Sequence, residues 1–389
     1  MIMLLENKKI AIIGGGPGGL TLARLLQQKN VNVKVYERDI NKNARVQGSP
    51  LDLHEHSGMA ALREAGLLDE FRKNYMIGAD KTTITNEQAE VVFSDHENDQ
   101  EEAFGDEFFR PEIDRGVLRN MLIDSLNAGT IIWNSQFIAM EKQGSGWLLN
   151  FKDGRSEYAD IVVGSDGANS KIRPYLTNIK PFYSGITMLE GNICDAEKKV
   201  PKISAILRGG KIMAFGNQKN ILMGQKSKGE IGFYASFKAE EHWAEKSGVD
   251  FANKPEMLEW FKTAYGEWSE FWLVLFEQAS TPYIPRPINC MPLNQSWATM
   301  PNLTLIGDAA HLMPPFAGEG ANMAMLDALE LSRLLLLEKY NDIQRAISLY
   351  ETEMRKRASS KAKESIENGE KMHSKHALAV MTSFFSGKS

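Results

Sequence analysis

The sequence has little cysteine, no long hydrophobic run and no excess of basic charge. Its two cysteines, Cys194 and Cys290, lie far apart and are too few for a disulfide framework or a zinc site. No stretch approaches the roughly 20 apolar residues of a membrane span, and the first apolar run is too short for a signal peptide. The formal net charge of −5 argues against a nucleic-acid partner. We therefore expect a cytoplasmic protein that binds no membrane, no nucleic acid and no metal.

What the sequence does contain is typical of a globular protein. Apolar residues make up 43% and charged residues 24% of the 389 positions, enough for a large core and two or three domains. Residues 95–107 are acidic and residues 355–363 are basic. We interpret both runs as solvated faces, because a charge run on a folded protein usually faces water.

The first 36 residues have the pattern of a strand, a glycine turn, a helix and a second strand. Residues 9–13 form a short β-branched run that suits a strand buried on both faces. Residues 20–30 place apolar side chains at helical spacing, and Val31, Val33 and Val35 then alternate as in a strand. This βαβ unit favours an α/β protein with a parallel sheet.

The glycine turn contains the spacing Gly14-x-Gly16-x-x-Gly19, with Pro17 between the last two. The first glycine suits a tight turn, the second lets the backbone approach a pyrophosphate, and the third lets the helix pack against the strand. Glu37, at the end of the second strand, is placed to accept hydrogen bonds from ribose hydroxyls. The pattern predicts dinucleotide binding without separating NAD from FAD; the alternative is an ordinary strand–helix turn.

The rest of the chain alternates between two types of pattern. Residues 115–127 resemble a helix, and residues 158–164 resemble a buried strand. Between residues 181 and 285 lie short runs at 203–207, 211–215, 220–224 and 232–237, which we expect to be strands of an antiparallel sheet. Residues 304–308 return to a buried strand, residues 318–338 to a helix, and residues 343–378 to a long polar-rich helix.

Two further glycine-and-aspartate motifs follow buried strands. The first runs from Gly164 through Asp166 to Arg173, and the second from Leu305 through Asp308 to Asn322. Asp308 ends a strand, Pro314 and Pro315 stiffen a turn, and the glycines at 318 and 320 allow close backbone approach to a ligand. The alternative for Asp308 is an ordinary turn aspartate. His311 is better explained by packing within the motif than by catalysis.

These three motifs, in this order, resemble those of group A flavoprotein monooxygenases. Local runs at 11–17, 35–39, 51–54, 111–115 and 307–318 are most similar to the TetX enzymes, which inactivate tetracycline. The resemblance implies a Rossmann-like FAD-binding domain of the para-hydroxybenzoate-hydroxylase type with an antiparallel-sheet substrate domain. We expect the FAD-binding domain to comprise 1–74, 104–180 and 286–340, the substrate domain 75–103 and 181–285, and a bridging C-terminal helix 341–389.

The resemblance also implies roles for individual residues. Glu37 and Arg38 would hold the adenosine end of FAD, Asp52 would lie at the flavin, and Arg115 would bind its phosphate or ribityl portion. Arg45 matches an arginine that handles NADPH, although residue type alone makes Arg45 and Arg115 ordinary surface arginines. The full predicted cofactor set is Gly14, Gly16, Pro17, Gly19, Glu37, Arg38, Arg45, Asp52, Arg115, Asp166, Asp308, Pro315, Gly318, Gly320 and Asn322.

The substrate sheet departs from the TetX pattern. Glu190, Lys211 and Gly232 stand where that family presents glutamine, arginine and histidine, so tetracycline is a candidate substrate only. Apolar residues at 188, 213, 215, 223 and 233 would line a pocket for a flat ring system or, alternatively, form ordinary sheet core. The predicted substrate set is Glu190, Lys211, Phe215, Met223, Pro315, Phe316, Gly318 and Met372, with Met372 at the pocket entrance or facing solvent.

The sequence therefore predicts a monomeric FAD-dependent monooxygenase that consumes NADPH and O2. The resemblance implies hydroxylation of an aromatic or polycyclic substrate through a flavin C4a-hydroperoxide, with no catalytic side-chain nucleophile. One alternative is a flavin reductase of the same fold; a halogenase is disfavoured because the motif Trp-x-Trp-x-Ile-Pro is absent. Another alternative is a non-catalytic flavin-binding module, which would show no substrate-stimulated oxidation of NADPH.

Overall fold

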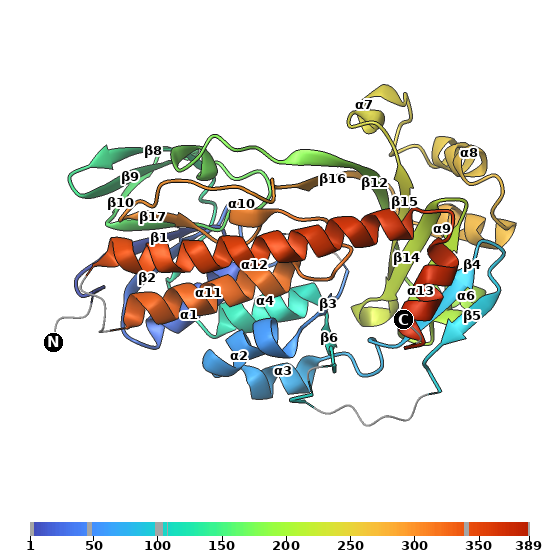
Figure 1. Cartoon of the computed structure of the whole chain (residues 1–389), viewed down its shortest axis with the longest axis horizontal. Helices are drawn as coiled ribbons and strands as arrows, with labels where there is room; N and C mark the ends of the chain where they lie inside the picture. The colour runs from blue at the N-terminus through green and yellow to red at the C-terminus, as the bar shows by residue number, and fades with distance from the viewer. Residues whose placement is uncertain (1–3, 45–48, 98–103, 107, 338–341, 388–389) are drawn as a thin grey trace.

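The computed structural model describes residues 4–44, 49–97, 104–106, 108–337 and 342–387, and its strands form two large sheets (Figure 1). The first is a five-stranded parallel sheet in the order β17-β11-β1-β2-β7. Its strands are β1 (Lys9–Ile13), β2 (Asn32–Tyr36), β7 (Ile131–Ile132), β11 (Ile161–Gly164) and β17 (Leu303–Leu305). All residues of β1 after Lys9 are buried, as the β-branched run predicted for a strand covered on both faces.

Helices and a small sheet cover the two faces of this parallel sheet (Figure 1). On one side lie α1 (Pro17–Gln27), α4 (Arg115–Asp124) and α11 (Gly320–Leu336). On the other side lies a three-stranded antiparallel sheet of β8 (Phe137–Gln143), β9 (Gly146–Phe151) and β10 (Ser156–Ala159). The ring of Tyr36 stacks on that of Phe151 at 4.8 Å, which joins the two sheets in one apolar core.

The second large sheet has seven strands in the order β16-β12-β15-β14-β13-β4-β5. These are β4 (Thr82–Asn86), β5 (Val91–Ser94), β12 (Phe182–Ile193), β13 (Lys211–Gly216), β14 (Lys219–Gln225), β15 (Ile231–Lys238) and β16 (Ile284–Cys290). The pairing is antiparallel except between β13 and β4. Most of β16 lies beyond residue 285, so the sheet takes in residues that we had placed in the FAD-binding domain.

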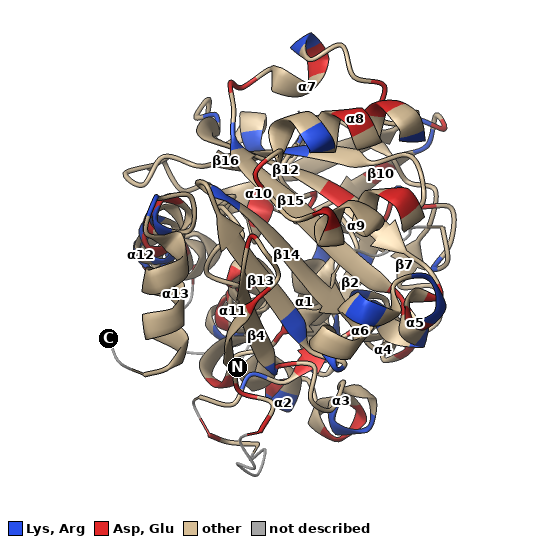
Figure 2. Ribbon diagram, turned by 90° about the vertical axis from the view of Figure 1, so that its right-hand side faces the viewer, with Lys and Arg blue, Asp and Glu red and all other residues tan. Residues whose placement is uncertain are grey.

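One face of the seven-stranded sheet is covered by α6 (Pro201–Leu207), α8 (Lys254–Ala264) and α9 (Leu273–Gln278), as Figure 2 shows. The expectation of a strand at 203–207 is therefore wrong. Pro201 begins α6, a position where its fixed φ favours a helix and its missing N–H costs nothing. Ile203 and Leu207, one helical turn apart, are both buried under the sheet. In a run of so few residues, the spacing of apolar side chains fits both a helix and a strand.

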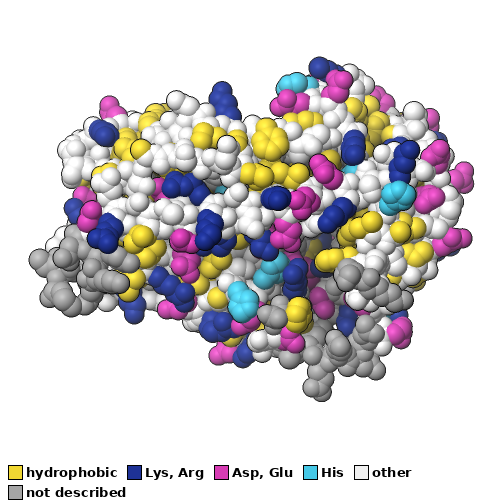
Figure 3. All heavy atoms as spheres, in the orientation of Figure 1, with side chains coloured by type: hydrophobic (Ala, Val, Ile, Leu, Met, Phe, Trp, Pro, Cys, Tyr) yellow, Lys and Arg dark blue, Asp and Glu magenta, His cyan; other side chains and the backbone are white. Residues whose placement is uncertain are grey.

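The longest helix, α12 (Ile343–Met372), runs from the parallel sheet to the seven-stranded sheet (Figure 1). Its 30 residues correspond to about 45 Å. The helix then ends, and α13 (Ala377–Phe385) packs against β4 and β13. The predicted bridging helix is thus two helices. Along the exposed side of α12, positive and negative side chains are interspersed (Figure 3).

The remaining elements are short. They are β3 (Leu51–Asp52) paired with β6 (Glu112–Ile113), a π-helical turn at Glu55–Met59, α2 (Ala60–Glu64), α3 (Leu68–Asn74), α5 (Ala196–Lys199), α7 (Trp243–Lys246), α10 (Asp308–His311) and 3-10 turns at Arg173–Tyr175, Ser227–Gly229 and Glu270–Trp272. Both cysteines are free thiols; Cys290 is buried and Cys194 half-buried. Among the described residues, no helix has the length and apolarity for crossing a membrane, and no group of three metal-binding side chains occurs.

Candidate functional site

The first glycine turn joins β1 to α1 and faces an open space. Gly14 has a φ of +109°, and a β-carbon there would lie 2.2 Å from the carbonyl oxygen of Ser165. Glycine is therefore required, and the turn touches the Asp-Gly motif directly. A β-carbon at Gly16 would meet nothing within 4 Å, so this backbone is open to a ligand. Pro17 occupies the first turn of α1, whose N-terminal N–H groups suit phosphate.

Glu37 is buried behind this turn and holds it in place. One carboxylate oxygen accepts from Gly15 N at 2.8 Å, and the other accepts from Asp39 N at 3.0 Å. Arg119, buried on α4, lies 3.8 Å from the Glu37 carboxylate and 3.1 Å from that of Asp39. Sequence reasoning missed Arg119, which had no motif to mark it. Arg38 is exposed beside Glu37, where it can reach a ligand at the strand end.

The Asp-Gly motif serves first to build its own turn. The Asp166 carboxylate accepts from Ser170 Oγ at 2.6 Å and from the backbone N–H of Lys171 at 2.7 Å. The Asp166 side chain is therefore used within its own turn, and Asp166 lies near the site only because its backbone packs beside Gly14. Arg173 donates from Nε to the carbonyl oxygen of Ala309 at 2.7 Å and from a terminal nitrogen to that of Asp308 at 2.8 Å. This buried guanidinium fastens the Asp-Gly motif to the Gly-Asp motif.

Asp308 presents a carboxyl group to the space between the motifs. No hydrogen bond to its side chain occurs within the described part of the chain. Burial raises the pKa of the Asp308 carboxyl, although the nearby His311, Arg115 and Arg173 act in the opposite direction. A β-carbon at Gly320 would approach nothing closer than the Asp308 oxygen at 4.0 Å. The carboxyl and the start of α11 thus border one open space.

A buried ion cluster supports the Gly-Asp motif from behind. His311 is 2% exposed, and its Nε2 contacts the carboxylate of the fully buried Asp327. Asp327 also accepts from Gly307 N at 2.9 Å and from Arg357 of α12 at 3.0 Å. Burial lowers the pKa of His311, but the Asp327 carboxylate outweighs it and the net direction is upward. His311 is therefore structural, and Arg357 of the basic run faces inward, not water as predicted.

A second cluster links the other side of the motif to α12. The Asp52 carboxylate lies 3.0 Å from Nε2 of His54, and Nδ1 of His54 lies 3.4 Å from Glu319. Glu319 pairs with Lys361 of α12 at 2.7 Å. Burial opposes protonation of His54, yet the two carboxylates raise its pKa to about 9. A β-carbon at Gly318 would lie 3.1 Å from the Asp52 carboxylate, so Asp52 borders the glycine turn; its predicted contact with the flavin stays a prediction.

Asn322 does not have a free side chain for a cofactor. Its Nδ2 donates to the carbonyl oxygens of Asp52 at 2.8 Å and Gly318 at 3.2 Å. Its Oδ1 accepts from the N–H groups of His54 and Gly58 and from a serine hydroxyl. This fully buried amide has used both of its donors. The Asn322 side chain ties the Asp52 strand to the glycine turn, so the predicted contact of Asn322 with the cofactor would have to come from its backbone.

The seven-stranded sheet turns its front face, the face opposite α8 and α9, toward these motifs. Cross-strand pairing places Lys211, Gly224 and Gly232 in one row of this face, with Tyr234 and Glu190 in the next row. Lys211 contacts Glu112 and Glu190 contacts Arg286, each as an ion pair. Arg115 lies between the two halves of the site and donates to the Ser49 carbonyl oxygen at 3.4 Å. Burial lowers the pKa of Arg115, while Tyr234, Asp308 and Glu190 act to raise it.

Several predicted substrate residues lie elsewhere. Met223 and Phe233 point to the opposite face and pack in the core under α8 and α9, so the prediction that Met223 binds substrate is wrong and the alternative of ordinary sheet core holds for both. Phe215 and Met372 are on the front face but are sealed between the sheet and the C-terminal helices, not at an open wall. Phe316 packs against α12 and the sheet, whereas Pro315 is exposed. Arg45 lies outside the described residues.

The three motifs together fit the cofactor FAD. The open backbone at Gly16 and the start of α1 suit a pyrophosphate, and Glu37 lies behind this turn, where the resemblance predicts the adenosine end. The Asp308 carboxyl is placed for a polyol, and the N-terminus of α11 favours negative charge on a ring beside Gly320.

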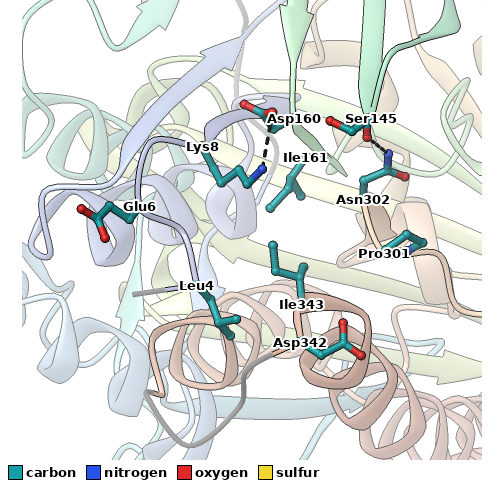
Figure 4. Close-up of a pocket in the computed structure, with 10 residues that line it drawn as sticks. All are labelled: Leu4, Glu6, Lys8, Ser145, Asp160, Ile161, Pro301, Asn302, Asp342 and Ile343. Carbon is teal, nitrogen blue, oxygen red and sulfur yellow. Dashed lines mark hydrogen bonds and ion pairs between the residues drawn. The ribbon is translucent and has the colours of Figure 1, made fainter. Parts of the chain in front are cut away.

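A separate hollow of about 630 Å³ opens at the other edge of the parallel sheet (Figure 4). Lys8 and Asp160 border it with an ion pair at 3.8 Å, and Asn302 donates to the Ser145 carbonyl oxygen. None of the predicted site residues lines this hollow, so it is not the flavin site.

Comparison with known proteins agrees with this geometry. The sequence pattern of the FAD binding domain family matches residues 7–251 and 277–365. A monooxygenase of Penicillium thymicola, penA, is 27% identical over 374 residues, which cover 84% of each chain. A 6-hydroxynicotinate 3-monooxygenase of Pseudomonas fluorescens is 26% identical over 367 residues, covering 91% of this chain and 89% of its own.

Solved structures share the fold at lower identity. Klebsiella pneumoniae HpxO complexed with FAD and uric acid superposes with a TM-score of 0.77 at 18% identity, covering 98% of this chain and 93% of that chain. The tetracycline destructase Tet(51) superposes with a TM-score of 0.72 at 18% identity, covering 100% of this chain and 96% of that chain. The fold is thus the α/β fold of the para-hydroxybenzoate-hydroxylase type, as predicted. The sequence relatives above are other monooxygenases, so similarity to TetX is seen in the fold alone.

Proposed function

Because the chain belongs to the FAD binding domain family and is an FAD-dependent monooxygenase, we propose that it uses NADPH and O2 to hydroxylate a flat, anionic aromatic or polycyclic substrate. The redox chemistry is supplied by FAD when it is bound. The protein contributes binding, orientation and a site closed to water. We further propose that it works as a monomer in the cytoplasm.

The observation that carries the substrate proposal is the make-up of the front face. Two cations, Lys211 and Arg286, lie there with the apolar side chains of Leu222 and Phe316, and a third, Arg115, lies nearby at the start of α4. Apolar contacts suit a ring system, and cations suit a phenolate, enolate or carboxylate on it. The ion pairs with Glu112 and Glu190 reduce the net positive charge but leave Arg115 with no carboxylate within hydrogen-bonding distance in the described chain.

Tetracycline is a specific candidate within this class. It is a fused-ring molecule with ionisable enols, and the fold is shared with tetracycline destructases. Smaller candidates come from the relatives, whose names specify 6-hydroxynicotinate and 3-amino-4-hydroxybenzoate as substrates. All three compounds carry a hydroxyl group on or near an electron-rich ring.

The test is a panel assay on the FAD-loaded enzyme. Each compound is added with NADPH, and NADPH consumption, O2 consumption and product mass are measured. A productive substrate stimulates NADPH oxidation and gains one oxygen atom. Stimulation without oxygen in the product would indicate a flavin reductase, and no stimulation by any compound would indicate the non-catalytic flavin-binding module. Replacement of NADPH by NADH in the same assay tests the nucleotide preference.

A further inference from the structure

The ion pair between Lys211 and Glu112 connects the front face to β6, the strand that pairs with β3. Lys211 begins β13, and its side chain is 34% exposed. Glu112 lies on β6 with a side chain only 4% exposed, directly across from Asp52 on β3. The Asp52 carboxylate in turn borders Gly318. The pair therefore places an accessible ammonium at the site and a hidden carboxyl directly behind it.

An open space lies beside Lys211 on the same face. Gly224 is its cross-strand partner, and a β-carbon built on Gly224 would meet no atom within 4 Å. Gly232 is the next residue across the sheet, but its position is covered, since a β-carbon there would lie 3.2 Å from Cδ of Lys226 and 3.3 Å from the Ser49 hydroxyl. A ring could lie over Gly224, beside the Lys226 side chain, with a substituent directed at the Lys211 ammonium. Leu222 and Tyr234, in the next row, would contact its edge.

The charges around the pair favour a change of protonation near neutrality. Burial raises the pKa of Glu112 to about 7, with Asp52 and Asp80 acting in the same direction and Lys211 in the opposite one. Burial opposes the charge on Lys211, but Glu112, Asp52 and Asp80 raise its pKa overall, so it stays an ammonium. A carboxyl with such a pKa is suited to take a proton at the pH of the cell.

We infer that Lys211 and Glu112 together remove the proton from a ring hydroxyl, phenolic or enolic, of a substrate lying over Gly224. Lys211 accepts the hydroxyl proton while it passes one of its own to Glu112. The O–H bond of the substrate breaks, the carboxylate becomes a carboxylic acid, and the ammonium is regenerated beside the new oxyanion. No electron changes hands in this step. The resulting oxyanion makes the ring richer in electrons, as oxygen insertion requires.

This inference rests on the proposed function and narrows its substrate class. A substrate must carry an ionisable hydroxyl, and its methyl ether should not be turned over even if it binds. Glu190 is excluded from this role because it pairs with Arg286 and lies one row away from Lys211.

The first measurement needs no substrate. Infrared spectra of the FAD-loaded enzyme are recorded across about pH 5 to about pH 9 for the wild type and Glu112→Gln. We expect a buried carboxylic acid signal that titrates near neutrality in the wild type and is missing in the variant. In Lys211→Met the same signal should titrate at higher pH, because the neighbouring positive charge is gone. A Glu112 carboxylate that stays ionised over the whole range would overturn the inference whatever the substrate.

The second measurement uses the panel compound that best stimulates the wild type, together with its methyl ether. We expect kcat to rise with pH through the pKa of Glu112, since the base must be deprotonated to act. Glu112→Gln should lower kcat by about 10²-fold or more and remove this rise, while FAD absorbance and thermal stability stay near those of the wild type. Glu230→Gln, which alters the Lys226 ion pair at 3.6 Å, is the matched control and should keep the rise.

The outcomes separate the two proposals. Stimulated oxygenation with an unchanged pH profile in Glu112→Gln, or equal turnover of the methyl ether, overturns the inference and leaves the proposed function standing. If no compound in the panel is oxygenated, the proposed function fails and this inference fails with it. If Glu112→Gln does not fold, Lys211→Met provides the same pH-profile test from the other member of the pair.

Discussion

The Nε2 atom of His373 lies 2.8 Å from the hydroxyl oxygen of Ser236, which ties the end of α12 to the front face of the seven-stranded sheet. Nδ1 of the same ring lies 2.7 Å from the carbonyl oxygen of Gly369. A carbonyl can only accept, so Nδ1 carries the proton and Nε2 accepts. Ser236 and the Asn220 amide, at 3.1 Å, are then the donors to Nε2. The buried ring is neutral.

This arrangement predicts a loss of stability in mild acid. Burial lowers the pKa of His373 from 6.5 to about 4, so the unfolded chain takes up the proton before the folded one. The stabilising contribution is full above about pH 6.5 and declines as the pH falls toward 4. Urea unfolding over this range should show a shallower decline for His373→Gln than for the wild type. Parallel curves would rule out His373 as the source.

Gly369→Ala should disturb the contact between α12 and Phe316. A β-carbon there would lie 2.7 Å from the Phe316 ring, although alanine in an open helix position would add up to about 1 kcal/mol of stability. We expect a net loss of about 1–3 kcal/mol in the free energy of unfolding, measured by urea denaturation. The double variant Gly369→Ala, Phe316→Leu should recover part of that loss. A stabilised single variant would show that the ring moves aside freely.

Arg173→Ala should weaken FAD binding beyond what its loss of folding stability alone would cause. The guanidinium holds the carbonyl oxygens of Asp308 and Ala309, and hydrogen bonds from a charged group contribute about 1.5–3 kcal/mol. We expect FAD to dissociate on gel filtration, with a lower melting temperature. Arg333→Ala, at an exposed ion pair on α11, serves as the control and should retain FAD. Equal flavin content in both variants would contradict the role of Arg173.

Asp308→Ala should weaken FAD retention without unfolding the chain. The carboxyl has no hydrogen-bond partner within the described residues, so its removal breaks no internal bond and relieves the cost of burying an acid. The FAD dissociation constant should rise by about tenfold or more, as expected for one or two lost hydrogen bonds to a ligand. Fluorescence of released FAD measures it. A variant purified with full flavin content would contradict the assignment.

The sequence predicted the parts of the site that depend on local geometry. The turn at Gly14 and the place of Glu37 directly after β2 follow from short-range rules of backbone conformation, whereas Asp308, expected at a strand end, begins α10 three residues after β17 ends. These rules hold because a tight turn between a strand and a helix restricts residue type at fixed spacing. That Gly14, Glu37 and Asp308 border one cofactor site stays a prediction from the resemblance.

The parts that depend on distant packing were missed or misread. For Met223 and Phe233 the sequence left pocket and sheet core open, because an alternating run shows two faces but not which one meets a ligand; the structure places both in the core. The two ion clusters were missed because α12 completes them from a distance along the chain: Arg357 pairs with Asp327, 30 positions earlier, and Lys361 pairs with Glu319. Asn322 belongs to the Gly-Asp motif, yet its side-chain amide is used in hydrogen bonds within the protein.

The open position at Gly224 also bears on how the substrate range of the proposed site could change. A methyl group at Gly224 would strain neither the backbone nor any neighbour, so its cost falls on the ligand alone. Larger side chains at Gly224 would fill the space over the sheet carbon by carbon, while the stability of the protein is kept. The range of accepted molecules can therefore drift through single mutations that leave the flavin machinery intact.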